Sequence, residues 1–408
     1  MSRRILLISL LIASAAPFAR AQPKPRVRAI TAFVRLDRDH YQAQVQDAVS
    51  FLHRAQAAYQ GAGYEVQTLR ITTQPFPEYT RGLSGDQQLA FLHRLDELAQ
   101  KEGFIASLGP AMLSDSDDRG MANLLSEVLA SSKNLSGSIV IAGQDGLHWK
   151  AIAAAAQTIQ YLAAHSPGAQ ANFNFAATAM LPPYGPFFPG AYFTAEGHQF
   201  AIGLESANVV QDAFSAGQDL PSARRSLAQK LTAAVTPIEK VATTLASGTG
   251  WTYAGMDVSP APLGEVSIGS AIEKLTGAPF GSSGTLTAAA LITSVLRQLP
   301  VKRAGYSGLM MPILEDSTLA RRWGEGRISI DGLLAYSSVC GTGLDTIPLP
   351  GKVSTLQVER MLSDTASLAY KWNKPLSVRL LPVPGKQAGE KTSFNDPHLV
   401  NTVLQPLP

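Results

Sequence analysis

Cysteine is almost absent from this 408-residue sequence. The one cysteine, Cys340, cannot form a disulfide within the chain, so stability must come from a packed core. Charged residues are also scarce, at 16% against the ~25% of an average globular protein. Hydrophobic residues reach 45%, which excludes a disordered chain and predicts a large globular protein.

The sequence also lacks a basic surplus outside its first 21 residues. The whole chain has 34 basic and 31 acidic residues, a net charge of +3. Three of the basic residues, Arg3, Arg4 and Arg20, lie in the segment 1–21, which has no acid. Removing these three from the 34 leaves 31, equal to the 31 acidic residues. A neutral chain without a basic run predicts neither nucleic acid nor anionic lipid as a partner.

No apolar run is long enough to span a bilayer, which needs about 20 residues. The apolar segment 5–16 follows Arg3 and Arg4 and precedes the small-residue site Ala19-Arg20-Ala21. This order is typical of a cleavable signal peptide over 1–21, with cleavage after Ala21. We therefore expect a periplasmic or secreted protein that has no membrane contact after leader removal. The alternatives are an uncleaved anchor and, from the paired arginines, a twin-arginine leader.

Several cofactor motifs are missing as well. The seven histidines form no HxH or HExxH pair, and no Walker loop, GxSxG or strand-borne GxGxxG occurs. We therefore expect no metal site and no cofactor.

Alternating strand and helix patterns fill the first half of the sequence. Strands are predicted at 28–35, 64–71, 104–108 and 138–142, with helices at 40–62, 87–101, 121–131 and 147–164. Further strands are predicted at 172–180, 200–205, 253–257 and 376–381. The alternation favours parallel βαβ units in one large α/β domain over 22–386, followed by an irregular tail over 387–408.

Acidic residues follow several predicted strands. Glu205 and Asp257 end strands, and Glu315 and Asp316 follow an apolar segment. Ligand sites in parallel sheets form at the carboxyl ends of strands, where such acids can serve as general acid or base. The alternative is that each one caps a helix or lies in a loop.

Two features could bind an anion. A glycine-rich turn opens a predicted helix and consists of Gly281, Ser282, Ser283, Gly284 and Thr285. Its free N–H groups and the helix dipole favour an anion, although an ordinary capped helix start has the same composition. Arg379, inside a late apolar strand, could bind a carboxylate or phosphate; the alternative is a salt bridge to one of the acids named above.

Cys340 lies in a glycine-rich turn that ends at Asp345. Such a turn can expose a sulfur atom and stabilise its thiolate, and Asp345 could orient a base. Cys340 is then a candidate nucleophile. The alternative is a small buried hydrophobic residue.

Several ungapped blocks resemble the prokaryotic domain-of-unknown-function family 711. They include FFPGAY at 187–192, DVSPAP at 257–262 and CGTGLD at 340–345, and the resemblance spans 27–385. It implies a ten-stranded α/β barrel similar to the pyruvate formate-lyase fold of glycyl radical enzymes, with Cys340 on a loop inside the barrel. The tail lacks a glycyl radical motif, so the resemblance implies no radical chemistry and no established activity.

These features lead to two hypotheses. The first is an exported, cofactor-free enzyme, a hydrolase, lyase or isomerase, that acts on a small polar or anionic molecule. Asp257 or Glu205 would be its acid/base, and Cys340 its possible nucleophile. The second is a non-catalytic protein that binds a small molecule on the same scaffold.

Overall fold

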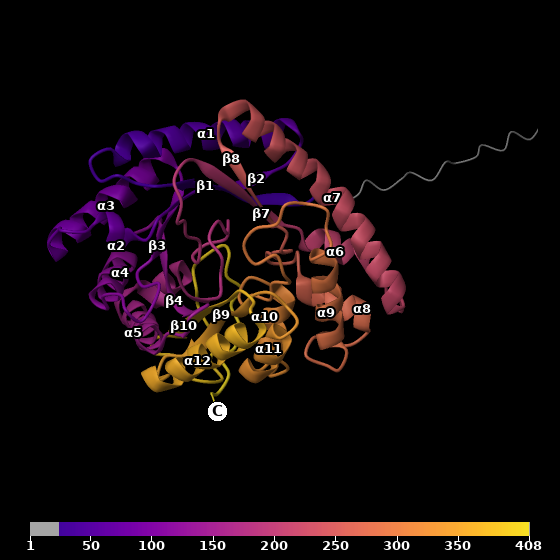
Figure 1. Ribbon diagram of the computed structural model, residues 1–408. Coiled ribbons are helices and arrows are strands. Elements are labelled where there is room, and N and C mark those ends of the chain that lie inside the picture. Colours follow the sequence, from indigo (N-terminus) through magenta and orange to yellow (C-terminus); the bar gives the residue numbers. More distant parts are fainter. Residues whose placement is uncertain (1–23, 408) are drawn as a thin grey trace, which may run out of the picture.

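The computed structural model describes residues 24–407, so the signal peptide expected over 1–21 lies outside the described residues. One mixed sheet forms the centre of the molecule (Figure 1). Its strands are β1 (Arg26–Val34), β2 (Val66–Thr73), β3 (Ile105–Pro110), β4 (Leu135–Gly143), β5 (Gly146–Leu147), β6 (Phe175–Ala179), β7 (Gln199–Glu205), β8 (Thr252–Asp257), β9 (Gly343–Pro350) and β10 (Leu376–Val383).

Helices surround this sheet on its outer side, while loops occupy the inside (Figure 1). They are α1 (Tyr41–Gly61), α2 (Phe76–Tyr79), α3 (Gly85–Glu102), α4 (Gly120–Ser131), α5 (Trp149–His165), the 3₁₀ segment η1 (Pro167–Asn174), α6 (Ala207–Ala213), α7 (Leu220–Thr249), α8 (Ile268–Thr276), α9 (Thr285–Leu296), α10 (Ser317–Gly324), α11 (Ile330–Ser337) and α12 (Thr355–Trp372). None of the helices within 24–407 is long and apolar enough to cross a membrane.

The sheet consists of three parallel blocks. The strand order is β8-β7-β1-β2-β3-β4-β6-β10-β9, with the short β5 paired to β4. The block from β1 to β6 is parallel, as the strand–helix alternation predicted. The pairs β7–β8 and β10–β9 are also parallel internally, but each joins the central block antiparallel. The α/β class and the ten strands are therefore confirmed.

The strand pairing does not close the sheet into the barrel that was expected. Within 24–407 the edge strands β8 and β9 do not pair with each other. The irregular segment 302–314 lies between them instead. It bonds to β8 through Met256 N–H and the carbonyl of Lys302 (2.8 Å), and to β9 through Ile313 N–H and the carbonyl of Asp345 (3.0 Å).

Strand β9 was not predicted, because its sequence contains Pro348 and Pro350. Proline cannot donate to a strand ladder and is confined to edges and bulges. The structure meets this rule, since β9 is an edge strand whose one strand partner among the described residues is β10.

The two faces of the sheet differ in chemistry. In β2, Leu69 and Ile71 point into the core beneath the helices, whereas Thr68 and Arg70 point to the inside. Because strand side chains alternate between faces, an apolar outer face leaves a polar inner face. The interior of the curved sheet is therefore the place where polar groups gather.

The chain after β10 folds back onto the molecule. Lys391 and Val403 form an antiparallel bridge, and Phe394, Leu399 and Leu404 pack with Leu314 and Leu381. This docking brings the tail to the inner face of the sheet.

Candidate functional site: a charged cavity inside the sheet

A cavity of about 600 Å³ lies on the inner face of the sheet. Its walls include Arg28, Thr68, Ile105 and Ser136, which belong to the first residues of β1, β2, β3 and β4. The cavity is thus at the amino ends of the central parallel strands, whereas the sequence placed candidate acids at the carboxyl ends of strands. The end of β7 lies beside the cavity, because β7 runs antiparallel to β1 and Glu205 bonds to Arg28 of the cavity wall.

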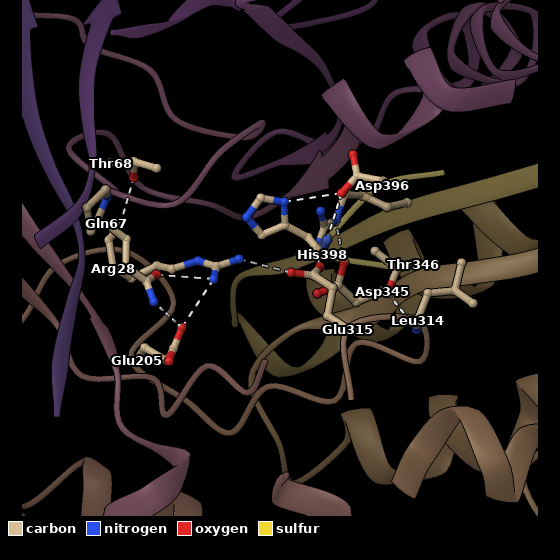
Figure 2. Close-up of polar contacts among 12 residues, drawn as sticks. Arg28, Gln67, Thr68, Glu205, Leu314, Glu315, Asp345, Thr346, Asp396 and His398 are labelled. Carbon is tan, nitrogen blue, oxygen red and sulfur yellow. Dashed lines mark hydrogen bonds and ion pairs between the residues drawn. The ribbon is translucent and has the colours of Figure 1, made fainter. Parts of the chain in front are cut away.

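Arg28 links two buried carboxylates across this cavity. Its Nη1 atom lies 3.2 Å from Oε2 of Glu205, and its Nη2 atom 3.3 Å from Oε2 of Glu315. Figure 2 shows the Arg28 side chain extended between these two acids. Gln67 donates to the same oxygen of Glu205 at 2.7 Å, and Arg26 donates to the other at 3.1 Å.

Arg379 continues the network on the opposite wall. Its Nη2 atom lies 2.6 Å from Oε1 of Glu315, and its Nε atom 2.5 Å from Oδ1 of Asp345. Arg28 and Arg379 both lie where the strand register shifts, between Val27 and Ala29 and between Val378 and Leu380. Such bulges re-aim side chains, and here both turn an arginine toward the interior.

Arg70 differs from these arginines because no carboxylate among residues 24–407 lies within ion-pairing distance of it. Its residue surface is 8% exposed. The guanidinium donates from Nε to Oγ1 of Thr68 at 2.9 Å and from Nη1 to the carbonyl of Pro186 at 3.4 Å. It lies over the ring of Phe188, 4.9 Å from the centroid. A buried cation facing a cavity without an acidic partner indicates an anion site.

Burial shifts the pKa values of Asp345 and Arg70, two of the groups that line the cavity. It raises the pKa of Asp345, and the nearby Glu315 raises it further, while Arg379 opposes both effects. Burial, reinforced by the like charge of Arg28, lowers the pKa of Arg70 to about 9. Arg70 therefore stays cationic at neutral pH.

His398 comes to the cavity from the C-terminal tail. Its Nδ1 atom lies 3.1 Å from Oδ1 of Asp396, and Oδ2 of the same carboxylate accepts from Nε2 of Gln170 at 2.8 Å. Figure 2 shows the imidazole on the side of the cavity from which Glu315 and Asp345 come.

Four of the residues that the sequence singled out come together here: Glu205, Glu315, Asp345 and Arg379. Arg379 forms the salt bridges that were the alternative to ligand binding, with Glu315 and Asp345 as its acids. Glu205 is joined to them through Arg28 and Glu315.

Asp257 is fully buried and is not among the described residues that line the cavity. Its carboxylate accepts from Ser259 N–H (3.0 Å), Ser259 Oγ (2.6 Å), Tyr306 N–H (2.7 Å) and Ser307 N–H (3.0 Å). Burial raises its pKa to about 6, against the lowering effect of these donors. Asp257 positions the turn that carries Tyr306 to the cavity.

Cys340 does not join this group, because it is fully buried and is not among the described residues that line the cavity. Its Sγ atom contacts Oγ of Ser337 at 3.9 Å, and burial raises the pKa of its thiol. A buried, protonated thiol fits the alternative of a core residue better than a nucleophile.

The glycine-rich turn 281–285 also lies away from the cavity. Gly284 is the N-cap of α9, and Gly281 donates its N–H to Oγ1 of Thr285 at 3.2 Å. Asp316 caps helices as well: its buried carboxylate accepts from N–H groups that open α8 and α10.

Arg28 and Arg70 were missed by sequence reasoning. Both lie inside strands that were predicted, and the argument used for Arg379, a cation within an apolar strand, applies equally to them. The alternation Thr68, Arg70, Thr72 was the further signal that one face of β2 is polar. No group of three or more potential metal-ligating side chains is found within residues 24–407.

The fold and this cavity define an α/β protein whose curved mixed sheet encloses a network of arginine–carboxylate pairs. By its sequence the chain belongs to the family described as Uncharacterised ACR (DUF711), whose model matches residues 21–395. The predicted family resemblance is thereby confirmed.

Related proteins come from several prokaryotes. A UPF0210 protein of Pyrobaculum arsenaticum is 31% identical over 349 residues, which cover 80% of this chain and 76% of the relative. UPF0210 proteins of Desulfovibrio desulfuricans (28% identity, 85% and 80% covered) and Oenococcus oeni (26%, 86% and 81% covered) are also similar. The names of these relatives do not state an activity.

Proposed function

We propose that this protein is an exported, cofactor-free enzyme that binds a small anionic molecule in the interior cavity and acts on it by proton transfer. The observation that supports the proposal is Arg70, a buried guanidinium that faces the cavity without a carboxylate partner among the described residues. Arg28 and Arg379 are paired with carboxylates of the protein. An anionic ligand would therefore supply the negative partner that Arg70 lacks among the described residues.

Acid–base chemistry is supported by two carboxyl groups of the cavity, Asp345 and Glu315, which bond to different atoms of the same Arg379 guanidinium. The raised pKa of Asp345 makes it the candidate proton donor, and Glu315, 2.6 Å from the shared Arg379, is the candidate acceptor. Pairs of carboxyl groups with different environments are a common way to divide acid and base roles. A hydrolase, lyase or isomerase reaction fits this arrangement.

A non-catalytic binding protein is the second candidate. It is favoured by the fact that Glu205, Glu315 and Asp345 are all bonded to arginines, which leaves none of them without a partner. The same cavity would then hold its ligand without turnover.

One experiment separates these functions. The purified protein is incubated with a panel of small carboxylates and phosphate esters, and both binding and product formation are followed by NMR. If Asp345→Asn abolishes turnover and changes binding by less than about threefold, the enzyme proposal is supported, because the lost group acts in the reaction only. Binding without turnover across the panel would favour the second candidate. No binding in the cavity would overturn both.

Export is supported by the leader composition of residues 1–21. The likeness to the pyruvate formate-lyase barrel also stays a proposal, in which the segment 302–314 takes the place of a closing strand. Its support is that this segment bonds to both edge strands.

A further inference from the structure

The hydrogen-bond donors of Arg70 indicate which kind of anion fits. A guanidinium has five N–H donors in a fixed plane. The Nε–H is bonded to Thr68 and one Nη1–H to the carbonyl of Pro186. This leaves one N–H on Nη1 and both on Nη2, enough donors to hold the two oxygens of a carboxylate.

An apolar wall lies beside this cation. Phe187, Ala261 and Met310 form a small hydrophobic cluster, with Tyr306 packed against it, and all four line the cavity. The ring of Phe188 covers one face of the Arg70 guanidinium. Within the described residues, a cavity that combines a cation lacking a carboxylate partner, Arg70, with an aromatic and aliphatic wall matches a ligand with one charged end and an apolar body.

The charge of the cavity limits the charge of the ligand. Among the described residues of the cavity wall and its ion-pair network, four arginines, Arg26, Arg28, Arg70 and Arg379, equal in number the four acids Glu65, Glu205, Glu315 and Asp345. A dianion such as a phosphate monoester would bring a second negative charge close to these acids, and the described lining of the cavity holds no surplus of arginines to balance it. A monoanion bound to Arg70 would add one negative charge, which the uptake of one proton by Asp345 would offset, since burial raises the pKa of Asp345.

We propose that the cavity binds a monocarboxylate with an apolar body, whose two carboxylate oxygens are held by Nη1 and Nη2 of Arg70 and whose body packs against Phe187, Phe188 and Met310. This assignment rests on the proposed function, because it names the class of ligand for the same cavity. It adds a prediction that the proposed function alone does not make, namely preference for one carboxylate over a phosphate.

Matched probes test the assignment by isothermal titration calorimetry. Phenylacetate and hexanoate carry the carboxylate, 2-phenylacetamide is the neutral analogue, and phenyl phosphate is the dianionic one. We expect phenylacetate to bind about tenfold or more tightly than both analogues, since a charged hydrogen bond contributes that much. Arg70→Met should weaken phenylacetate binding about tenfold to 100-fold and leave 2-phenylacetamide unchanged. Arg70→Lys keeps the positive charge but loses the planar pair of donors. Its affinity for phenylacetate should therefore lie between those of the unmodified protein and Arg70→Met.

The exposed Arg54 on α1 supplies the control variant Arg54→Met, which should bind as the unmodified protein does. Thermal unfolding of each variant verifies that it is folded. If phenyl phosphate binds more tightly than phenylacetate and still requires Arg70, the monocarboxylate assignment is wrong and the anion cavity stands. If no probe binding depends on Arg70, the assignment and the proposed function both fail.

Discussion

The Nε atom of Arg379 lies 2.5 Å from Oδ1 of Asp345, and the two side chains come from the neighbouring parallel strands β10 and β9. Removing the cation would leave Asp345 and Glu315 buried beside each other. We therefore expect Arg379→Met to lower the free energy of unfolding by about 3–5 kcal/mol, the cost of breaking a buried ion pair from one side. Urea unfolding at pH 7 measures it. A loss below about 1 kcal/mol would mean that the network is solvated like a surface pair.

Arg70→Met, in contrast, should not lower the free energy of unfolding by a large amount. Arg70 is buried, but it neutralises no acid within 24–407. Its removal therefore leaves no buried carboxylate without its partner, unlike the removal of Arg379. The carbonyl of Pro186 keeps a donor, Oγ1 of Thr31 at 3.0 Å. We expect the free energy of unfolding to stay within about 1 kcal/mol of the unmodified protein or to rise. A loss as large as that of Arg379→Met, in the same urea titration, would show that Arg70 is a structural cation and not a ligand anchor.

The fold could be predicted from the sequence where local patterns decide it. The helix expected over 87–101 is observed as Gly85–Glu102, because Ser84 and Gln87 form a capping box and Gly103 adopts a left-handed C-cap. The antiparallel joins of β7 to β1 and of β10 to β6 could not be predicted. They pair strands that are distant in the chain, and no local signal encodes that direction.

The candidate site was predicted in part for a similar reason. Arg379 was predicted because it is a cation within an apolar strand, and Glu205 because it is an acid at the end of a strand. Which acid each arginine meets depends on separations such as the 287 residues between Arg28 and Glu315. Burial also decided the outcome for Cys340, whose glycine-rich turn is compatible with either an exposed or an enclosed sulfur.

Asp316 caps two helices with one carboxylate. It accepts from the N–H groups of Ile268 (2.7 Å) and Gly269 (3.1 Å) in α8 and of Thr318 (2.9 Å) and Leu319 (3.0 Å) in α10. Asp316→Ala should cost about 3 kcal/mol or more, since each lost cap costs up to ~2 kcal/mol and the freed groups are buried.

The matched control for this prediction is Asp219, an exposed N-cap that bonds to Ser222 N–H alone, at 2.9 Å. Asp219→Ala should cost about 1 kcal/mol. Chemical denaturation of both variants gives the comparison. Equal losses would contradict the double-cap interpretation.

Export predicts a processed N-terminus. If residues 1–21 are a cleaved leader, the protein recovered from the periplasm or medium begins at Gln22. Intact mass and N-terminal sequencing of the protein expressed from its full gene measure this. Leu7→Arg interrupts the apolar run and should retain the unprocessed chain inside the cell. A chain that keeps Met1 in the unmodified protein would contradict the proposal.

Asp257 should make folding depend on pH. Its pKa is raised from an ordinary 3.8 to about 6, chiefly by burial, so the folded state holds its proton more tightly than the unfolded state. Stability from this group is therefore full below about pH 4 and is lost as the pH rises through about 6, by about 3 kcal/mol for two pKa units. We expect the free energy difference between the unmodified protein and Asp257→Asn to shift by about this amount, in favour of Asp257→Asn, between pH 4 and pH 7. Asp345 and Asp316 titrate in both proteins and cancel in the difference. Urea unfolding across this range tests it, and a pH-independent difference would mean that the four donors on Asp257 hold its pKa near the ordinary value.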